Sequence, residues 1–442
     1  MLKFFFIILQ IVLILIIVLT IVNNSFTVSF ALNDYIYSIS SSYLFIFLIF
    51  LFLLLFFLQS FYFKTKFRYS KYKVNKFLKN KNKGYDSFVS GMIALANKDY
   101  KKAIVESKKI SKYMNDNRSL SLLLKSEIYK IEKKYDDLNL VYLEMIKDKS
   151  TENLAFRGMM EQYLRSQDYH HAFIYGEKLF NKNPFIEKIY DALVNIISKT
   201  NNWQQLISIT DKAYSKKIID KKTFQENKSI GFYEIAKIKQ FSQLKESLIF
   251  IEQSLALRSN FPPYVKFYLE LLIKDKNYNK AKKILKKAWN EKPHPEYKSI
   301  IIKLATNLKI DTIELIKFII GNNLHLEDSK ILLVEISILN QSWDMARNYI
   351  KELLDVEPKK EVCLLMAKIE EGDSGDIQKI NSWTLRAKNG AEKNVWICMI
   401  SNKAQDEWSS VSRGGYFNSL EWKQPYMLSE FKDIDLALNY EN

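Results

Sequence analysis

Residues 265–289 read VKFYLELLIKDKNYNKAKKILKKAW, and the pattern in this stretch recurs along the chain. The first half repeats apolar residues at helical spacing, a polar turn follows, and the second half repeats them again. The second half opens on an aromatic ring, Tyr278, and has a small residue, Ala281, three positions later. We expect two helices joined by a tight turn, with the ring in the seam between them and the small residue admitting the next unit.

The same pair of residues, an aromatic followed at the third position by a small or aliphatic one, recurs mostly 34 to 38 residues apart. This period and these residue types are typical of tetratricopeptide-like helical hairpins, which stack because one hairpin cannot bury its apolar face alone. Three units also have a proline fifteen residues after the ring, where it stops the second helix. The pairs are Tyr100 and Ala103, Tyr135 and Leu138, Tyr169 and Ala172, Trp203 and Leu206, Phe241 and Leu244, Tyr278 and Ala281, and Trp343 and Ala346, with Pro184, Pro293 and Pro358 as the prolines.

The hairpin array is predicted to run from residue 84 to residue 388. Gly91 and Ala94 take small positions in the first helix, and the unit around Ile310 to Leu315 has no clear ring. The last step between rings, from Tyr278 to Trp343, is close to two units. Such arrays bind peptides or protein helices on their concave face. The alternative is an ordinary α-helical domain in which this spacing arises by chance.

The first 63 residues contain two apolar runs, 4–22 and 43–63, each about as long as the roughly 20 residues that cross a bilayer. They predict two transmembrane helices joined by a short outer loop, 23–42, whose partial alternation is compatible with a hairpin. The alternative for the first run is a cleaved signal peptide, with small residues at Ser29 and Ala31. Nine Lys/Arg and no acid follow in residues 64–83, so the positive-inside rule predicts a cytoplasmic array and a two-pass topology with both termini cytoplasmic.

The formal net charge of +17 invites a nucleic-acid-binding interpretation. Residues 1–83, however, hold ten Lys/Arg against the single acid Asp34, so more than half of the excess lies beside the apolar runs. We interpret the basic segment 64–83 as a topology signal with some contact to anionic headgroups, and expect no nucleic-acid partner.

The tail, 389–442, differs in composition from the array. Cys398-x-x-Ser401 and Ser412-x-x-Gly415 have the outline of two zinc knuckles, but a tetrahedral zinc site needs four S or N donors and only one cysteine is present. No metal is therefore predicted. Three tryptophans within the tail predict a small compact appendix, either folded back on the last hairpin or offered to a partner. The whole fold is predicted to be all-α, with two spans, a repeat array and this appendix.

Motifs for catalysis are scarce. The chain has no Gly-x-Gly-x-x-Gly and no Walker A loop, and its two cysteines, Cys363 and Cys398, form no redox motif. By their pattern, Glu370 and Glu371 are expected on a helix surface. His170 and His171 are expected to be exposed or capping rather than metal-binding or catalytic. His294 lies between two prolines in a turn, and His325 has no cysteine close in sequence. We predict no catalytic residue, no cofactor and no enzyme activity.

Several motifs resemble those of HemY-type membrane proteins of proteobacteria, which are associated with haem biosynthesis. They are the loop FTVSFALNDYIYSIS, the first hairpin GMIALANKDYKKA and the tail VWICMISNKAQDEWSSVSRGGYFNSLEWKQP. The tail residues that match the alphaproteobacterial branch are Trp396, Trp408, Ser412, Gly415, Trp422 and Pro425. Some relatives carry four cysteines there as a zinc ribbon, so the tail of this chain resembles a degenerate zinc ribbon without its ligands.

The resemblance implies an inner-membrane scaffold that gathers enzymes of late haem or porphyrin synthesis through its groove, and no catalytic residue transfers from it. Two alternatives stay open. One is an adaptor for envelope biogenesis or proteolysis, similar in layout to lipopolysaccharide assembly protein B. The other is direct haem or porphyrin binding by the array.

Overall fold

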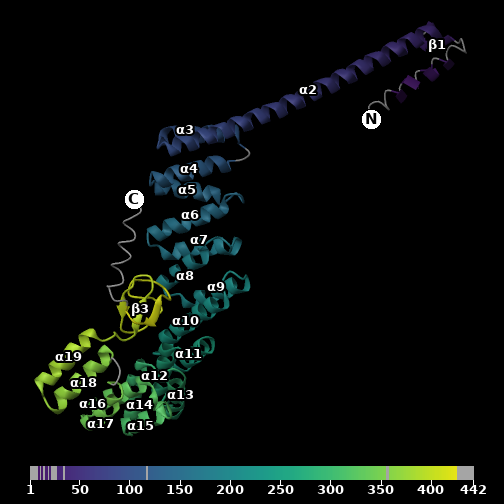
Figure 1. Ribbon diagram of the computed structural model, residues 1–442. Coiled ribbons are helices and arrows are strands. Elements are labelled where there is room, and N and C mark those ends of the chain that lie inside the picture. Colours follow the sequence, from purple (N-terminus) through teal and green to yellow (C-terminus); the bar gives the residue numbers. More distant parts are fainter. Residues whose placement is uncertain are drawn as a thin grey trace. The chain divides into compact units, whose positions relative to one another are not determined.

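The computed structural model describes residues 8–9, 11–12, 15–17, 19–20, 27–32, 35–115, 118–354 and 358–425. The chain divides into two compact units, Met1–Val141 and Tyr142–Asn442, each with a packed interior of its own. Figure 1 shows helices through most of the described chain and a short β-sheet near its C-terminal end.

In the first unit, strands β1 (Thr27–Leu32) and β2 (Tyr35–Ser40) pair antiparallel, with Thr27 opposite Ser40 and Leu32 opposite Tyr35. The hairpin considered for the loop between the apolar runs is therefore present. Both strands are largely exposed, so the sheet does not contribute a core. The chain passes directly from β2 into the long helix α2 (Ser41–Ala96).

Helix α2 is continuous over 56 residues and includes the predicted span 43–63, the basic segment 64–83 and the first helix of the array. Within the described residues it is the one helix long and apolar enough to cross a membrane, with a mean hydropathy of 2.8 over its most apolar window and no part of that window buried. The predicted span over 4–22 lies largely outside the described residues. The predicted boundaries at 63 and 83 thus mark changes in composition along a single helix.

The C-terminal end of α2 packs into the first hairpin of the array. It lies against α3 (Tyr100–Tyr113) and α4 (Ser119–Ile131), around a small core that includes the fully buried Ala103. Gly91 lets Leu124 approach α2 closely, because a Cβ there would stand 2.4 Å from Cδ2 of Leu124 and push that side chain away. Helix α5 (Tyr135–Met145) then leads into the second unit.

The second unit consists of successive helices joined by short turns, followed by a small sheet (Figure 1). Each helix packs against its neighbours in the chain, and one hydrophobic core runs from Phe156 to Ile336 and on into the tail. Its helices are α6 (Glu152–Arg165), α7 (Tyr169–Lys182), α8 (Ile189–Thr200), α9 (Trp203–Ser215), α10 (Lys221–Lys239), α11 (Leu244–Leu257), α12 (Pro262–Lys274), α13 (Tyr278–Glu291), η1 (Pro295–Tyr297), α14 (Lys298–Leu308), α15 (Thr312–Ile320), η2 (Asn323–His325), α16 (Glu327–Leu339), α17 (Trp343–Lys351), α18 (Lys360–Asp373) and α19 (Ile377–Asn389).

One turn design explains why the aromatic residues recur. The turn has three positions. A residue with positive φ, the usual way to stop a helix, ends the first helix of the hairpin, and one further residue follows it. The aromatic residue comes next and is the first residue of the second helix. Asp168 illustrates the middle position, because its carboxylate accepts a hydrogen bond of 3.1 Å from the His171 amide and so caps α7. The residues with positive φ at these turns are Lys98, Lys133, Gln167, Asn201, Lys276 and Gln341.

Several of these rings reach the hairpin that follows. The Tyr278 hydroxyl donates to Oδ1 of Asn307 in α14 at 3.3 Å. The Trp343 ring lies against α18, where a Cβ on Gly372 would come within 2.2 Å of it. The small partners Ala172, Ala281 and Ala346 are fully buried. Ring and small residue together therefore join one hairpin to the next.

Two units depart from this design. Phe241 was expected in a seam, but its side chain is 84% exposed in a longer turn, and α11 begins only at Leu244. The Lys274 ammonium lies 4.7 Å from the centre of that ring. The long step between Tyr278 and Trp343 contains a further hairpin, α14 and α15, which uses Asp311 as a cap and has no ring at the start of its second helix.

The tail corrects the all-α prediction. It forms a three-stranded antiparallel sheet in the order β4 (Ala404–Gln405), β3 (Val395–Cys398), β5 (Leu420–Lys423). Trp396 in the central strand stands opposite Trp422 in β5. These strands are too short for a clear alternation, so their sequence gave little indication of a sheet.

Candidate functional site

The tail sheet folds back onto the first helices of hairpins in the middle of the array. The ring of Trp408 meets those of Tyr233 in α10 and Phe261 and Tyr264 at the start of α12, with ring centres 5.1 to 5.5 Å apart and edge-on geometry. Ser410 donates a 2.7 Å hydrogen bond to the buried Glu234 of α10. The sequence suggested that the tail folds back on the last hairpin or is offered to a partner. The start of the tail does contact that hairpin, where the Lys360 amide of α18 donates to the Ala391 carbonyl at 3.1 Å, but its aromatic part packs on helices more than 100 residues earlier.

A second set of contacts holds the tail at the turn before α14. The indole Nε1 of Trp396 donates to Oε1 of Glu296 at 2.6 Å, and the Trp422 ring centre lies 4.5 Å from that of His294. His294 is 2% exposed, and burial together with the charges of Lys292 and Lys266 lowers its pKa to about 4. The imidazole is therefore neutral at physiological pH and packs as an aromatic ring.

The two segments that resemble zinc knuckles in sequence, Cys398 to Ser401 and Ser412 to Gly415, lie close together in the structure. Sγ of Cys398 lies 3.2 Å from Oγ of Ser419. Burial alone would raise the pKa of this thiol, but the hydroxyls of Ser401, Ser419 and Ser412 lower it to about 6. Hydroxyl groups thus stand around the one cysteine. In the part of the chain that the structure describes, no three His, Cys, Asp or Glu side chains meet at a spacing suited to a metal ion.

The remaining tail residues singled out by sequence occupy the loop between β4 and β5 and the end of the sheet. Oγ of Ser412 accepts a hydrogen bond of 3.2 Å from the Tyr416 amide, and Gly415 has a φ of +81° that favours glycine. Pro425 is the last described residue. These residues shape the fold of the tail.

The other histidines have separate surroundings. Nδ1 of His171 lies 2.7 Å from the Asp168 carboxylate, and its ring stacks on Tyr163 with centres 5.1 Å apart. His170 is its neighbour on α7, and Nδ1 of His325 lies 3.2 Å from the Asn322 carbonyl. These three therefore belong to a helix start and to the turn of η2.

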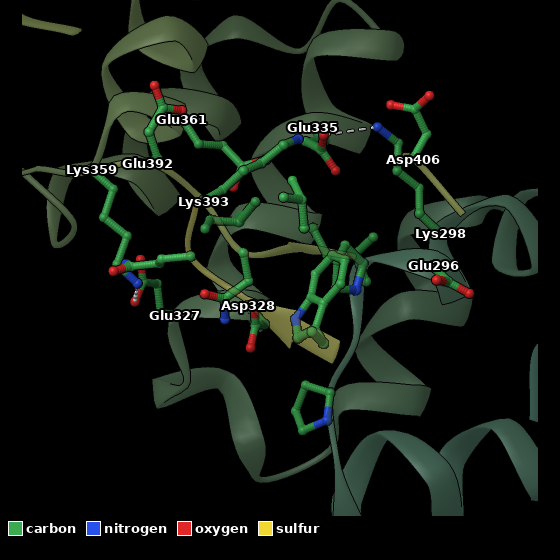
Figure 2. A pocket seen from close by; sticks show the side chains of 18 of the residues that line it. Glu296, Lys298, Glu327, Asp328, Glu335, Lys359, Glu361, Glu392, Lys393 and Asp406 are labelled. Carbon is green, nitrogen blue, oxygen red and sulfur yellow. Dashed lines mark hydrogen bonds and ion pairs between the residues drawn. The ribbon is translucent and has the colours of Figure 1, made fainter. Parts of the chain in front are cut away.

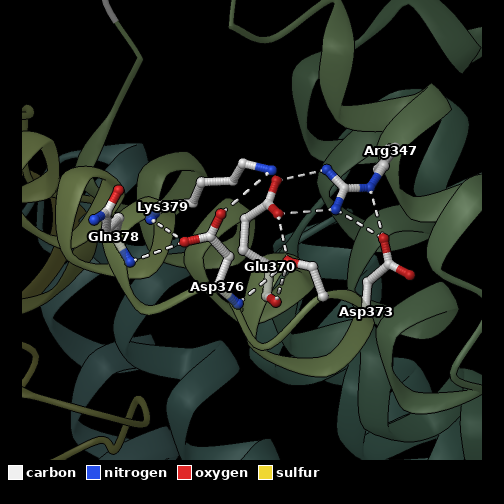
Figure 3. Close-up of polar contacts among 7 residues, drawn as sticks. Arg347, Glu370, Asp373, Asp376, Gln378 and Lys379 are labelled. Atoms are coloured by element: carbon white, nitrogen blue, oxygen red, sulfur yellow. Dashed lines mark hydrogen bonds and ion pairs between the residues drawn. The ribbon is translucent and has the colours of Figure 1, made fainter.

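Glu370 differs from its prediction, because it is buried and not on the surface. Both of its oxygens accept hydrogen bonds from the Arg347 guanidinium, at 2.6 and 3.0 Å, and Asp373 accepts from the same group at 2.8 Å (Figure 3). The hydrogen bonds from Arg347 hold the pKa of Glu370 below its usual range. This bidentate pair joins α17 to α18, and the helix pattern could not reveal it because the partner lies in another helix.

The strongest candidate for a binding site is a cavity of about 420 Å³ between the starts of α14, α16 and α18 and the tail, which we call the acidic pocket. Its apolar lining includes Trp289, Ile331 and Trp422. Figure 2 shows charged side chains on several sides of it. The charged residues that line it are Glu296, Lys298, Glu327, Asp328, Glu335, Lys359, Glu361, Glu392, Lys393 and Asp406.

The lysines around the acidic pocket are all engaged. Lys298 pairs with Glu335 at 3.0 Å, Lys359 with Glu327 at 2.6 Å, and Lys393 with Glu361 at 3.3 Å. Lys360, just outside, pairs with Glu392. The Arg413 guanidinium likewise lies 3.4 Å from the Asp406 carboxylate. Of the seven lining carboxylates, Asp328 and Glu296 therefore have no ion-pair partner among the described residues, so the pocket keeps a small excess of negative charge although the chain as a whole is strongly basic.

Asp328 has the most informative surroundings in the acidic pocket. Its side chain is accessible to solvent, yet burial by the surrounding walls and the charge of Glu327 raise its pKa. A group that is both accessible and surrounded lies inside a concavity. Burial likewise raises the pKa of Glu296, against the hydrogen bond from Trp396. Both carboxylates therefore lie in partly desolvated surroundings, Asp328 in the first turn of α16 and Glu296 at the turn before α14.

No sequence signal marked this pocket, because its residues come from three hairpins and the tail.

No family model and no curated relative matches the chain. The solved structures that resemble it include Naa15/Naa10 bound to HypK-THB, with 13% identity, coverage of 70% of this chain and 54% of that one, and a TM-score of 0.39. The alignment thus spans about half of that protein.

Two further structures cover more of their own length. The TPR2AB domain of yeast Sti1 in complex with pHSP90 aligns with 69% of this chain and 98% of its own, at 11% identity and a TM-score of 0.30. Yeast Tom70 aligns with 71% of this chain and 82% of its own, at 14% identity and a TM-score of 0.30. The hairpin array of the present chain is established by its own helix bounds and packing.

Proposed function

We propose that this protein is a non-enzymatic, membrane-anchored scaffold that holds other proteins through its hairpin array. The observation that carries the proposal is the acidic pocket, a cavity with an apolar lining and a charged rim that lies on the first helices of the hairpins. An apolar centre with a polar rim is the composition of a protein–protein contact surface. The apolar part of α2 is long enough to serve as an anchor, and the basic residues 64–83 support a cytoplasmic array.

The choice of partners rests on the resemblance of the loop, first hairpin and tail to HemY-type proteins. We propose that the partners are enzymes of late haem or porphyrin synthesis, gathered at the cytoplasmic face of the bacterial inner membrane. Two spans, 4–22 and 43–63, complete this proposed topology. In this proposal the buried polar groups of the tail serve the fold, and substrates are transformed by the bound partners.

The test uses the full-length chain, tagged at its C-terminus and purified from detergent-solubilised membranes after mild crosslinking. We expect haem-pathway enzymes to be enriched over a control membrane protein with a similar anchor. Depletion of the protein is expected to change porphyrin pools and leave lipopolysaccharide unchanged. Recovery of envelope-biogenesis or protease subunits, with lipopolysaccharide altered instead, would replace the haem part of the proposal. Recovery of no specific protein would contradict the scaffold itself.

A further inference from the structure

We propose that the acidic pocket receives an extended basic segment of a partner protein, with a lysine or arginine side chain pointing toward Asp328. This inference rests on the proposed scaffold function and specifies the chemistry of the segment that is bound. Its first support is charge. Five of the pocket carboxylates are paired with lysine or arginine, which leaves Asp328 and Glu296 without a cationic partner among the described residues.

Asp328 is the carboxylate best placed for a cationic ligand. It is in the first turn of α16, within the pocket lining, and has no hydrogen-bond or ion-pair partner among the described residues. The helix N-terminus tolerates this charge, but the neighbouring Glu327 repels it. A guanidinium or ammonium group would relieve that repulsion and form a charge-assisted hydrogen bond in partly desolvated surroundings.

The apolar lining fits the rest of such a side chain. Trp289 is 1% exposed and supports the wall from behind, where its Nε1 donates a 2.9 Å hydrogen bond to Oγ of Ser329. Trp422 and Ile331 line the same space. Lysine and arginine have long aliphatic stems that pack on such surfaces, and their charged ends are attracted to indole faces. A carboxylate-bearing segment would meet neither feature.

The pocket extends beyond a single side chain. A second cavity of about 240 Å³, lined by Leu364 and Leu365, adjoins the first. Its three glutamates, Glu335, Glu361 and Glu392, are balanced by Lys360, Lys368 and Lys393, so it offers apolar surface without an excess of charge. The two cavities together form a groove along α16 and α18, which favours an extended polypeptide over a small free cation.

The tail covers other helices of the array and leaves the groove beside α16 open to a partner. The first helices α10 and α12, on the same side of their hairpins as α16, are already covered through Trp408 and Ser410. The groove beside α16 is bounded by the tail residues Val395 and Trp422 and is left accessible. The tail therefore acts as one wall of the binding groove.

The experiment measures fluorescence anisotropy of a short fluorescein-labelled peptide, in which arginine and leucine alternate with glycine and serine, bound to the full chain in a neutral detergent. The matched peptide has citrulline in place of arginine, which keeps the size and removes the charge. We expect binding that weakens with added salt and is lost with citrulline. Asp328→Asn should weaken it about tenfold, and Asp328→Lys should abolish it. Asp344→Asn, an equal change of charge on exposed α17 outside the groove, should leave it unchanged.

Equal binding of the citrulline peptide, or unchanged affinity in both Asp328 variants, would overturn the proposal. Competition by spermidine as effective as that by the unlabelled peptide would reassign the pocket to polyamines and also overturn it. If partners still co-purify with the Asp328→Lys chain, the scaffold function stands and this pocket is not its binding site. If the peptide binds as expected but no protein co-purifies, the proposed function fails while the chemistry of the pocket holds.

Discussion

Replacing Trp408 with alanine is expected to weaken the attachment of the tail to the array. The side chain is 7% exposed, and three aromatic rings surround it at centre distances of 5.1 to 5.5 Å. Removing a buried tryptophan in this way typically costs about 3 to 5 kcal/mol, a range that includes the edge-on ring contacts. The contacts of Trp396 with Glu296 and of Trp422 with His294 remain, so we expect the loop that carries Trp408 to leave α10 and α12 first and the sheet to be held less tightly.

The assay combines urea unfolding, followed by circular dichroism, with limited proteolysis of the full chain in detergent. Trp408→Phe is the matched control. The indole Nε1 has no acceptor among the described residues, so phenylalanine keeps most of the ring packing and removes an unpaired buried donor. We expect cleavage near residue 390 to accelerate in the alanine variant and to change little in the phenylalanine variant. A loss below about 1 kcal/mol for alanine, or equal losses for both, would refute the role assigned to Trp408.

Two further predictions concern buried charge. Glu370→Gln should destabilise the array by about 2 kcal/mol in thermal unfolding, because it leaves Arg347 with a weaker partner. Glu371→Gln, on the exposed side of the same helix, is the control and should be neutral. Equal effects of the two substitutions would contradict the buried ion pair between Glu370 and Arg347. His294 is neutral when folded, with a pKa of about 4 against 6.5 in the unfolded chain, so its contribution is complete above pH 6.5 and is lost as the pH falls toward 4. The loss amounts to about 3 kcal/mol, and His294→Gln should remove that part of the pH dependence; an unchanged profile would contradict the burial of a neutral imidazole.

The sequence predicted the hairpins well because each one repeats the same local physics. Tyr169, Trp203, Tyr278 and Trp343 all begin the second helix of a hairpin, as the spacing indicated. Phe241 has the same spacing, but a longer turn moves the helix start to Leu244 and leaves the ring outside. Spacing alone does not encode the length of a turn.

The site was less accessible to sequence analysis because it depends on contacts between distant segments. Glu370 has the pattern of a surface residue, and only its position opposite Arg347 makes it part of the interior. The acidic pocket combines residues from Trp289 to Gln424. The tryptophans of the tail indicated packing, but their partners in α10 and α12 were set by how the array presents its surface.

The return of the tail to the middle of the array changes how this repeat protein can assemble during synthesis. In an ordinary array each unit rests only on its neighbours, so hairpins can form one after another as they leave the ribosome. Here Phe261 and Tyr264 gain their covering ring, Trp408, only when a segment made about 150 residues later has emerged. A truncated product that lacks the last strands would therefore expose an aromatic surface on its central helices, a feature by which quality-control proteases could recognise unfinished chains.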